Sequence, residues 1–274
     1  MLKKQLKPIL KYPFPLTVRE ARAYVSSPKV LINSLPKSGT FLLRRLLSLL
    51  PQFAPRWSYH GLVAETPNLF DRLTNIQKGQ YVSGHLYWSQ ALADVLETAN
   101  ISTLFIIRDP RDVVVSLTNY LTYRNKNHRL HSYFKQLGSD SERLMAAIVG
   151  IDACLLGDRR EESIGEHVAC FYPWLSEKRC CSVRFEDLIG YSGGGSSEKQ
   201  LENVCAIVDY LGLDLPAARL KKISNRLFFQ SSTTFRKGQI GDWQNHFSPA
   251  HKQAFKAVAG KALIQLGYEK DDSW

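Results

Sequence analysis

The chain has 274 residues, of which 44% are hydrophobic, and this length and composition fit one α/β domain over residues 1–274 rather than two domains. Its net charge of +11 is spread along the chain, and no zinc-finger, RNP-like or helix–turn–helix pattern accompanies it, which argues against a nucleic-acid partner. The five cysteines are an odd number without C-x-x-C spacing, so they indicate neither a disulfide framework nor a zinc site.

Residues 1–28 are basic and are interrupted by Pro8, Pro13 and Pro15. The segment lacks the apolar stretch of a secretory signal, and we expect it to be an N-terminal extension of the domain. The most leucine-rich stretch, Phe41–Leu50, contains two arginines and is too short to span a bilayer. We therefore expect a cytoplasmic protein without a membrane span.

A short apolar run, Val30–Leu35, predicts a buried strand, and apolar residues at helical spacing predict a helix over Phe41–Leu50. In the turn between them, Lys37 adds a positive charge and Gly39 lets a ligand approach the backbone. Such a turn directs N–H groups and the positive end of the helix dipole at one point, which favours a phosphate-bearing ligand. An ordinary strand–turn–helix connection with a surface lysine is the alternative.

The order of residues in this turn argues against an ATPase or a GTPase. A Walker A loop places its lysine directly after the second of two glycines. Here Lys37 precedes the only glycine, and no glycine stands where the first one should be. We therefore expect another class of phosphate-bearing ligand.

Residues 81–86, YVSGHL, predict a short strand that ends at His85. An imidazole titrates near neutral pH, so His85 is a candidate general base. The alternative is a structural imidazole whose hydrogen bonds are satisfied within the fold. The competing candidates are His60, His128, His131 and His246.

Residues 103–120, TLFIIRDPRDVVVSLTNY, predict a second strand that leads into a helix. Arg108 ends the strand and Ser116 lies about two turns into the helix, so both side chains can converge on one anion. A guanidinium fork and a hydroxyl suit a terminal phosphate monoester. Alternatively, Arg108 pairs with Asp109 or Asp112 at the start of the helix.

The middle of the chain carries helical patterns and one more strand. The basic cluster 124–129 either borders the ligand cleft or forms a solvated loop. The glycine-rich stretch 191–197 predicts a flexible connection. We predict helices over Ser141–Leu156, Glu166–Trp174 and Leu201–Leu211, and a strand over Cys181–Phe185.

Residues 235–247 read FRKGQIGDWQNHF. This segment is too rich in glycine for a helix and too charged for a core strand, so it predicts a loop. Loops of this composition carry function more often than packing. A basic surface loop without function is the alternative.

Together these segments resemble the sulfotransferases that use 3′-phosphoadenosine 5′-phosphosulfate (PAPS). The turn LPKSGT is similar to their phosphosulfate-binding loop, Arg108 and Ser116 match their 3′-phosphate motif, and residues 236–243 match their R-K-G-x-x-G-D-W signature. The resemblance implies that the nucleotide is bound by Lys37, Ser38, Gly39, Thr40, Phe41, Arg108, Ser116, Arg236, Lys237 and Gly238.

The resemblance also implies a fold and a reaction. It implies a three-layer α/β/α domain with a short, mostly parallel sheet, the P-loop-kinase-like sulfotransferase fold. In the implied reaction, His85 is the catalytic base, Lys37 neutralises charge on the leaving phosphate, and the sulfuryl group of PAPS moves to a hydroxyl or amine of a small-molecule acceptor. We expect the acceptor to be a secondary metabolite, the product to be 3′,5′-ADP (PAP), and no metal to take part. A non-catalytic nucleotide- or nucleic-acid-binding module is the alternative.

Three positions depart from the family pattern. Ser83 replaces a lysine that lies two residues before the catalytic histidine of the family, so one positive charge is missing. Leu42 occupies the place of a tryptophan that stacks on adenine. We therefore expect Phe185, which replaces the tyrosine of a Y-E-D-L segment, or else Phe228 or Phe229, to hold the adenine.

Two further expectations concern the acceptor and assembly. We expect residues 124–178 to contribute helices that border the acceptor pocket, together with the aromatic residues Trp57, Tyr59, Tyr87, Trp88 and Tyr133. Residues 248–251 do not preserve the Lys-Thr-Val-Glu dimer motif of many relatives, so the oligomeric state stays open.

Overall fold

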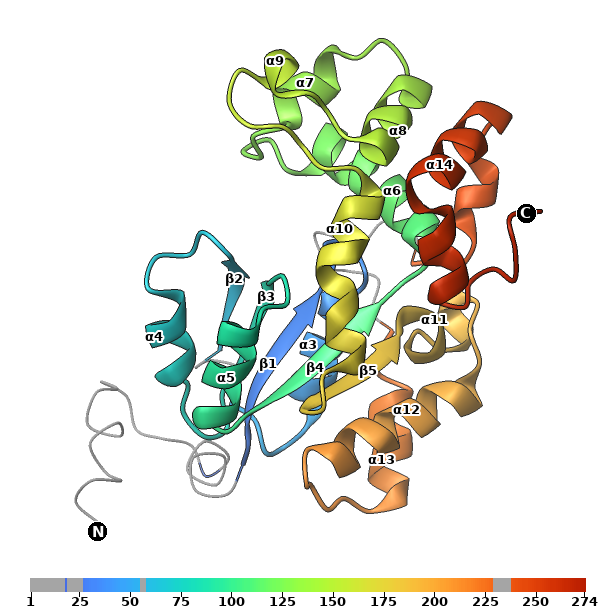
Figure 1. Cartoon of the computed structure of the whole chain (residues 1–274). Coiled ribbons are helices and arrows are strands. Elements are labelled where there is room, and N and C mark those ends of the chain that lie inside the picture. Colours follow the sequence, from blue (N-terminus) through green and yellow to red (C-terminus); the bar gives the residue numbers. More distant parts are fainter. Residues whose placement is uncertain (1–17, 19–26, 55–57, 229–237) are drawn as a thin grey trace.

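The computed structural model describes residues 18, 27–54, 58–228 and 238–274. In these ranges the chain forms a five-stranded sheet in the order β2-β3-β1-β4-β5, with parallel pairing between all neighbouring strands. Helices cover both faces of the sheet (Figure 1), so the prediction of a three-layer α/β/α domain is confirmed. The strands are β1 (Lys29–Ser34), β2 (Tyr59–Val63), β3 (Tyr81–His85), β4 (Ile101–Ile107) and β5 (Cys180–Arg184).

The central strand β1 is buried on both faces, which is why it is a nearly continuous apolar run in the sequence. Val30 and Ile32 pack into one core, and Leu31 packs into the other. The first core contains side chains of α3 (Thr40–Leu49), α11 (Phe185–Leu188), α12 (Ser197–Tyr210) and α13 (Ala217–Ser224). The second contains side chains of α4 (Leu69–Thr74), α5 (Gln90–Thr98), α6 (Pro110–Asn119), α10 (Ile164–Phe171) and α14 (Pro249–Gln265).

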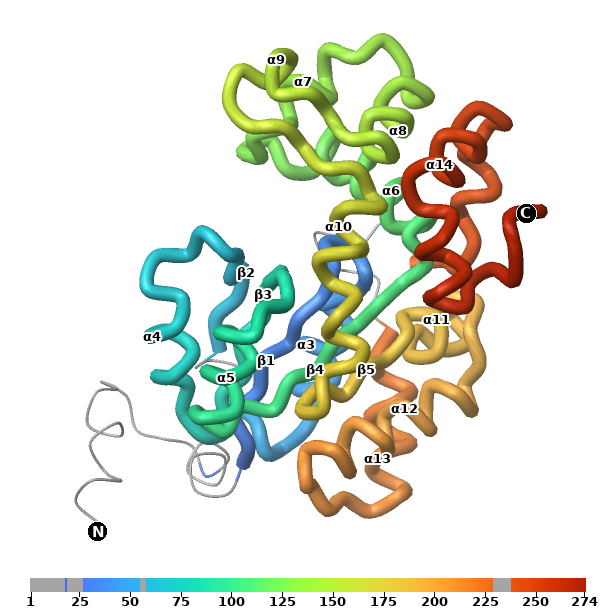
Figure 2. The backbone as a smooth tube through the Cα atoms, in the orientation of Figure 1, coloured from blue at the N-terminus to red at the C-terminus, as the bar shows by residue number. Residues whose placement is uncertain are grey.

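The carboxyl ends of the strands meet at one edge of the sheet. At this edge β1 turns into α3, β3 ends at His85, and β4 leads into α6, as the course of the backbone in Figure 2 shows. In parallel sheets such an edge is where ligands bind. The fold thus brings the three predicted functional segments to one place.

Beyond α6 the chain makes a π-helical turn, Tyr120–Arg124, which we call the π turn. It continues into α7 (His131–Gln136), α8 (Asp140–Val149) and α9 (Ala153–Leu156), which lie apart from the sheet (Figure 1). The prediction of one helix over Ser141–Leu156 is wrong. Gly150, with a φ of 84°, ends α8, and Ile151 then pairs with Glu161 in an antiparallel bridge.

Two other elements differ from the sequence prediction. The helix predicted over Glu166–Trp174 ends at Phe171, because Pro173 lies in a 3₁₀ turn that follows it. The edge strand β2 was not predicted, because its sequence YHGLV buries only Leu62 and is interrupted by a register shift. None of the described helices is both long and apolar enough to cross a membrane.

Candidate active site

The turn between β1 and α3 has a backbone that favours glycine at one position. Gly39 has a φ of 102°, and a Cβ atom there would lie 2.6 Å from Cδ2 of Phe185. Lys37, with a φ of 72°, also adopts the left-handed conformation that side chains rarely take. As the N-cap of α3, Gly39 has no side chain to satisfy the first N–H groups of the helix. The turn therefore presents these groups to an anion.

The ammonium group of Lys37 lies within a group of cations. Its Nζ atom is 4.0 Å from the centre of the Tyr120 ring, at the start of the π turn. Burial, together with the charges of Arg108 and Arg124, lowers the pKa of Lys37 to about 8. Because both arginines repel the Lys37 ammonium, a polyanion that binds beside Lys37 relieves this repulsion.

The imidazole of His85 is oriented by the neighbouring strand. Its Nδ1 atom lies 2.8 Å from the carbonyl oxygen of Ser34, and because a carbonyl only accepts, Nδ1 carries the proton. Nε2 therefore holds the lone pair that a general base needs. Burial lowers the pKa of His85, and Lys37 acts in the same direction, which favours the neutral ring. The Ser34 hydroxyl also lies 2.6 Å from Oγ1 of Thr40, so one residue joins the base to the start of α3.

Asn33 positions His85, a role that the sequence alone does not reveal. Its Nδ2 donates to the carbonyl of Leu86 at 2.8 Å, and the Leu86 N–H donates to its Oδ1 at 2.8 Å. This fully buried side chain fixes the backbone directly after His85 to the central strand. The signal in the sequence was a polar residue inside an otherwise apolar strand.

We expect Asn33→Ala to lower the free energy of unfolding by about 1–3 kcal/mol, because the Leu86 N–H would stay buried without a partner. Turnover should fall as well, since His85 follows the displaced backbone. Urea denaturation measures the first effect. The matched control is Asn75→Ala, which removes an exposed side-chain bond to the carbonyl of Asp71 and should change the free energy by less than about 0.5 kcal/mol. Equal losses in both variants would contradict the positioning role.

Arg108 lies at the end of β4 and is only 8% exposed. It donates to the carbonyl of Gln239 at 2.9 Å, and its Nη2 lies 3.4 Å from Oδ2 of Asp112. The alternative ion pair considered from the sequence thus exists, but the buried Nε of Arg108 has no partner among the described residues. Ser116 is half-buried about one turn beyond Asp112 on the same helix. Arg108 therefore keeps a donor for a ligand.

The Asp112 carboxylate closes the glycine-rich loop onto α6. Its Oδ2 accepts from the N–H of Gly241 and its Oδ1 from the N–H of Trp243, both at 2.9 Å. These bonds hold the loop beside Arg108. Of the loop residues predicted to bind nucleotide, the structure describes Gly238, whereas Arg236 and Lys237 lie outside the described residues.

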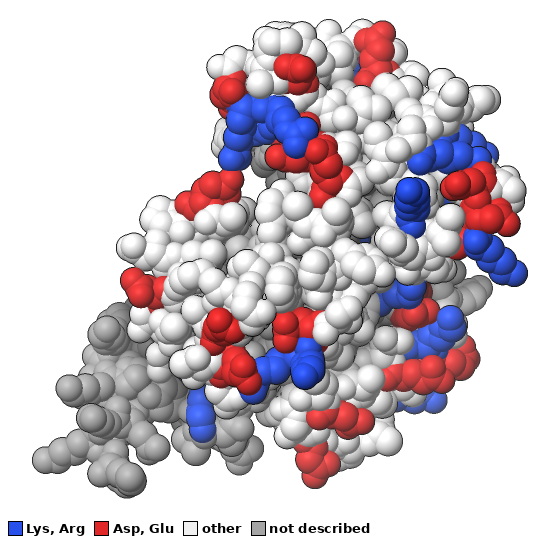
Figure 3. All heavy atoms as spheres, in the orientation of Figure 1, with Lys and Arg blue, Asp and Glu red and all other residues white. Residues whose placement is uncertain are grey.

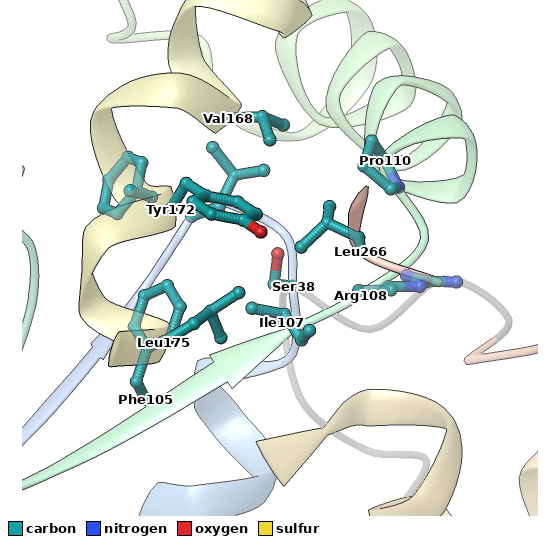
Figure 4. Close-up of a pocket in the computed structure, with 11 residues that line it drawn as sticks. Ser38, Phe105, Ile107, Arg108, Pro110, Val168, Tyr172, Leu175 and Leu266 are labelled. Atoms are coloured by element: carbon teal, nitrogen blue, oxygen red, sulfur yellow. The ribbon is translucent and has the colours of Figure 1, made fainter. Parts of the chain in front are cut away.

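A small cavity lies behind the turn, on the side of β4 and α10 (Figure 4). Its volume of about 20 Å³ suffices for about one water molecule. The Ser38 hydroxyl is fully buried, points into this cavity toward Tyr172, and has no hydrogen-bond partner among the described residues. Lys37 and Thr40 are thus the side chains of the turn that lie on the side of His85.

Structural contacts account for the competing histidines. His60 Nδ1 lies 3.0 Å from Oγ of Ser83 on the neighbouring strand, and burial lowers the pKa of His60 to about 4. The others contact the Leu130 N–H (His128, 3.3 Å), the Leu121 carbonyl (His131, 2.7 Å) and the Asp242 carboxylate (His246, 3.3 Å). Among these histidines, His85 is the one that Ser34 orients beside the turn.

The residues considered for adenine lie at different depths. Leu42 packs into the core beneath α3, so its side chain does not replace the stacking tryptophan of the family. Phe185 is 4% exposed, and its ring centre lies 4.3 Å from the guanidinium carbon of Arg108. Phe41 is half-buried in the first turn of α3. Phe228 is partly buried against the core, and Phe229 lies outside the described residues.

One cluster of possible metal ligands lies near α10. The ligand atoms of Glu161, Glu162 and His167 are within 4.8 Å of one another. Glu161 pairs with Arg129 and lies 3.3 Å from Nε2 of His167, so two of the three groups already have partners within the protein. His167 also bonds to the Tyr87 hydroxyl through Nδ1 at 3.2 Å.

Comparisons with known proteins agree with this arrangement. The family model described as the sulfotransferase domain matches residues 27–267. Mouse sulfotransferase 2A6 is 25% identical over 88% of this chain and 86% of its own length. Human sulfotransferase 2A1 is 24% identical over 92% of this chain and 91% of its own length.

Solved structures share the fold. Mouse sulfotransferase SULT7A1, crystallised with PAP, has a TM-score of 0.63 at 19% identity and covers 89% of this chain and 88% of its own. Retinol dehydratase, crystallised with androsterone and PAP, has a TM-score of 0.55 at 15% identity and covers 94% of this chain and 85% of its own. The match of the family model over most of the chain shows that this protein belongs to the sulfotransferase family of PAPS-dependent enzymes.

Proposed function

We propose that the protein transfers the sulfuryl group of PAPS to a hydroxyl or amine of a small-molecule acceptor and releases PAP. The observation that carries this proposal is that a cation and a candidate base lie close together at the carboxyl ends of the strands. Lys37 lies in the anion-binding turn, and His85 is linked to that turn through Ser34 and Thr40. This is the pair of groups that sulfuryl transfer needs.

Charge and unsatisfied donors support PAPS as the sulfuryl donor. The first N–H groups of α3 and the Thr40 hydroxyl would hold the 5′-phosphosulfate. Arg108, with its unpartnered Nε, and Ser116 would hold the 3′-phosphate beside Gly238. The PAP in the structures of mouse SULT7A1 and retinol dehydratase supports the same assignment. Arg236 and Lys237 remain predicted 3′-phosphate contacts.

The distribution of charge favours a small polyanion over nucleic acid. On the face shown in Figure 3, lysines and arginines lie next to acidic side chains rather than in a continuous basic strip. Arg108 and Arg124, in contrast, both act electrostatically on Lys37 in the anion-binding turn. A compact group of cations suits a nucleotide with two phosphates.

The chemistry follows from the positions of Lys37 and His85. In this proposal, Nε2 of His85 takes the proton from the acceptor as the acceptor oxygen attacks sulfur. The bond between sulfur and the 5′-phosphate oxygen breaks, its electron pair stays on that oxygen, and the Lys37 ammonium neutralises the new charge. Because the transition state is loose, positioning and charge contribute more than covalent catalysis.

The residues that would border the acceptor pocket are proposed from their position in the fold, which we take to be a single domain. Residues 124–178, which contribute α7, α8 and α10, would border the acceptor pocket, with the π turn nearest to Lys37. Retinol dehydratase was crystallised with retinol and with androsterone, which supports a small organic acceptor. We keep a secondary metabolite as the proposed acceptor class.

We expect the protein to bind PAP more than tenfold tighter than 5′-AMP. The 3′-phosphate would contact Arg108 and Ser116, and each hydrogen bond to a charged group contributes about 1.5–3 kcal/mol. Calorimetric titration of the wild-type protein with both nucleotides measures the difference. Arg108→Gln should reduce the preference, whereas Arg45→Gln, on the exterior of α3, should leave it unchanged. Equal affinities of the wild type for PAP and 5′-AMP would overturn the proposed function.

A further inference from the structure

Strand β3, which ends at His85, contains no lysine or arginine. Ser83, which stands where the family has a lysine, is buried and bonded to Nδ1 of His60 at 3.0 Å. A negatively charged sulfuryl group in transit between two oxygens is stabilised by fixed positive charge. A second cation beside Lys37 must therefore come from another element if the site has one.

The π turn, Tyr120–Arg124, lies directly against the anion-binding turn. The Asn125 N–H closes it with a bond to the Tyr120 carbonyl at 3.0 Å, and the Asn125 amide fixes the Tyr120 hydroxyl at 2.9 Å. The ring held in this way lies 4.0 Å from the ammonium of Lys37. Such π-helical turns occur frequently at functional sites.

Arg124 is the last residue of this turn. It follows Tyr120 by four residues, which is about one helical turn, so the two residues lie on about the same side of the turn. Its side chain is exposed, and it makes no ion pair or hydrogen bond with the part of the chain that the structure describes. Its charge acts on Lys37. The pKa of Lys37 is lowered by burial and by the charges of Arg108 and Arg124. Arg124 thus extends from the turn whose first residue, Tyr120, packs against the Lys37 ammonium, and its charge reaches that group.

Among the described residues, the other cations near the site have other partners or other positions. Arg108 also acts on Lys37, but it is held by Gln239 and Asp112 at the start of α6. Arg129, in the same basic segment, is paired with Asp158 and Glu161. Lys126 is exposed but is not among the charges that act on Lys37. Arg44, on α3, acts on His60 instead.

We propose that Arg124, from the π turn, binds the sulfuryl group of the donor. It thereby supplies the positive charge that β3 lacks because Ser83 stands where the family has a lysine. This inference rests on the proposed function. Arg124 stays protonated throughout the reaction. The acceptor proton still goes to His85, and the electron pair of the broken sulfur–oxygen bond still goes to the phosphate oxygen next to Lys37.

The test compares binding of PAPS with binding of PAP, which lacks the sulfuryl group. We expect Arg124→Gln to weaken PAPS binding at least tenfold and PAP binding less than about threefold. The matched control, Lys126→Gln, should change neither affinity. Adding Ser83→Lys to Arg124→Gln should restore the PAPS affinity to within about threefold of the wild type, because it returns a cation to β3.

A second measurement is independent of nucleotide. In protein with ¹³C-methylated lysines, NMR titration should show the pKa of Lys37 rising above about 8 in Arg124→Gln but not in Lys126→Gln, because one neighbouring positive charge is gone. Arg108 and Arg124 are the described cations that act on Lys37, and His85 and Tyr120 are the other groups that face it.

The outcomes separate this inference from the proposed function. If Arg124→Gln behaves like Lys126→Gln, or weakens PAPS and PAP equally, the role of Arg124 is refuted while the proposed function stands. If the wild type binds neither PAPS nor PAP, both are refuted. Thermal unfolding of each variant, matched to that of Lys126→Gln, excludes a folding defect as the cause of a lost affinity.

Discussion

We expect His85→Ala to lower the turnover number roughly 10²-fold or more, because a positioned general base contributes about that much to a proton transfer. Affinity for PAP should stay nearly unchanged, since in the proposed function the imidazole contacts the acceptor rather than the phosphates. Turnover is measured as PAP release with an acceptor that the wild type sulfates, and affinity by calorimetry. A lower turnover number with intact nucleotide binding is the signature of an interaction made in the transition state.

The matched control for this variant is His60→Ala. His60 lies on the same face of the sheet but is bonded to Ser83, so its removal should leave turnover within about threefold of the wild type. If His85→Ala folds, binds PAP and still turns over at a near-normal rate, the proton acceptor lies elsewhere. A loss confined to His60→Ala would then reassign the base.

Lys37→Ala should weaken PAP binding by tenfold or more. The turnover number should fall by a larger factor than the affinity. In the proposed function, the Lys37 charge would face the ligand in the ground state and meet the growing negative charge in the transition state. The control is Lys37→Arg, which keeps the charge and should recover most of the affinity. Calorimetry and steady-state kinetics measure the two effects.

The pH dependence of binding gives this variant a second readout. With a pKa of about 8, Lys37 loses its proton as the pH rises above that value, so PAP affinity of the wild type should decline between about pH 8 and pH 10. Lys37→Arg should show a flatter profile, because arginine stays charged. Identical profiles would show that Lys37 does not contact the nucleotide.

The sequence predicts the central sheet because the strands that fold into its interior are apolar runs. The segments around Val30, Tyr81, Thr103 and Cys181 all form strands within one or two residues of the predicted ends. Edge strand β2 lies half in solvent and gives no such signal. The other edge strand, β5, also buries only one of its residues, and it was predicted because it leads into a segment that resembles the Y-E-D-L segment of the family. The break of the predicted helix at Gly150 depends on a bridge between Ile151 and Glu161, which local helical spacing does not reveal.

The site is predictable where residue type and local position decide the role. Lys37, Thr40 and His85 do meet at one edge, and Arg108 and Ser116 share one strand–helix junction. The roles of Asn33 and Tyr120 were not predicted, and neither was the closing of the glycine-rich loop by Asp112, because each depends on a contact with a segment distant in sequence. The cytoplasmic location, the absence of a metal and the oligomeric state stay predictions or open questions from the sequence.

Sulfuryl transfer itself is tested most directly by incubating the wild-type protein with PAPS and a panel of phenols, alcohols, amines and sugars, with mass spectrometry of every acceptor. We expect at least one acceptor to gain the mass of one sulfuryl group while an equal amount of PAP appears, and we expect His85→Ala to abolish most of both. Release of PAP at the same rate with and without acceptor, with no acceptor gaining mass, would contradict this expectation.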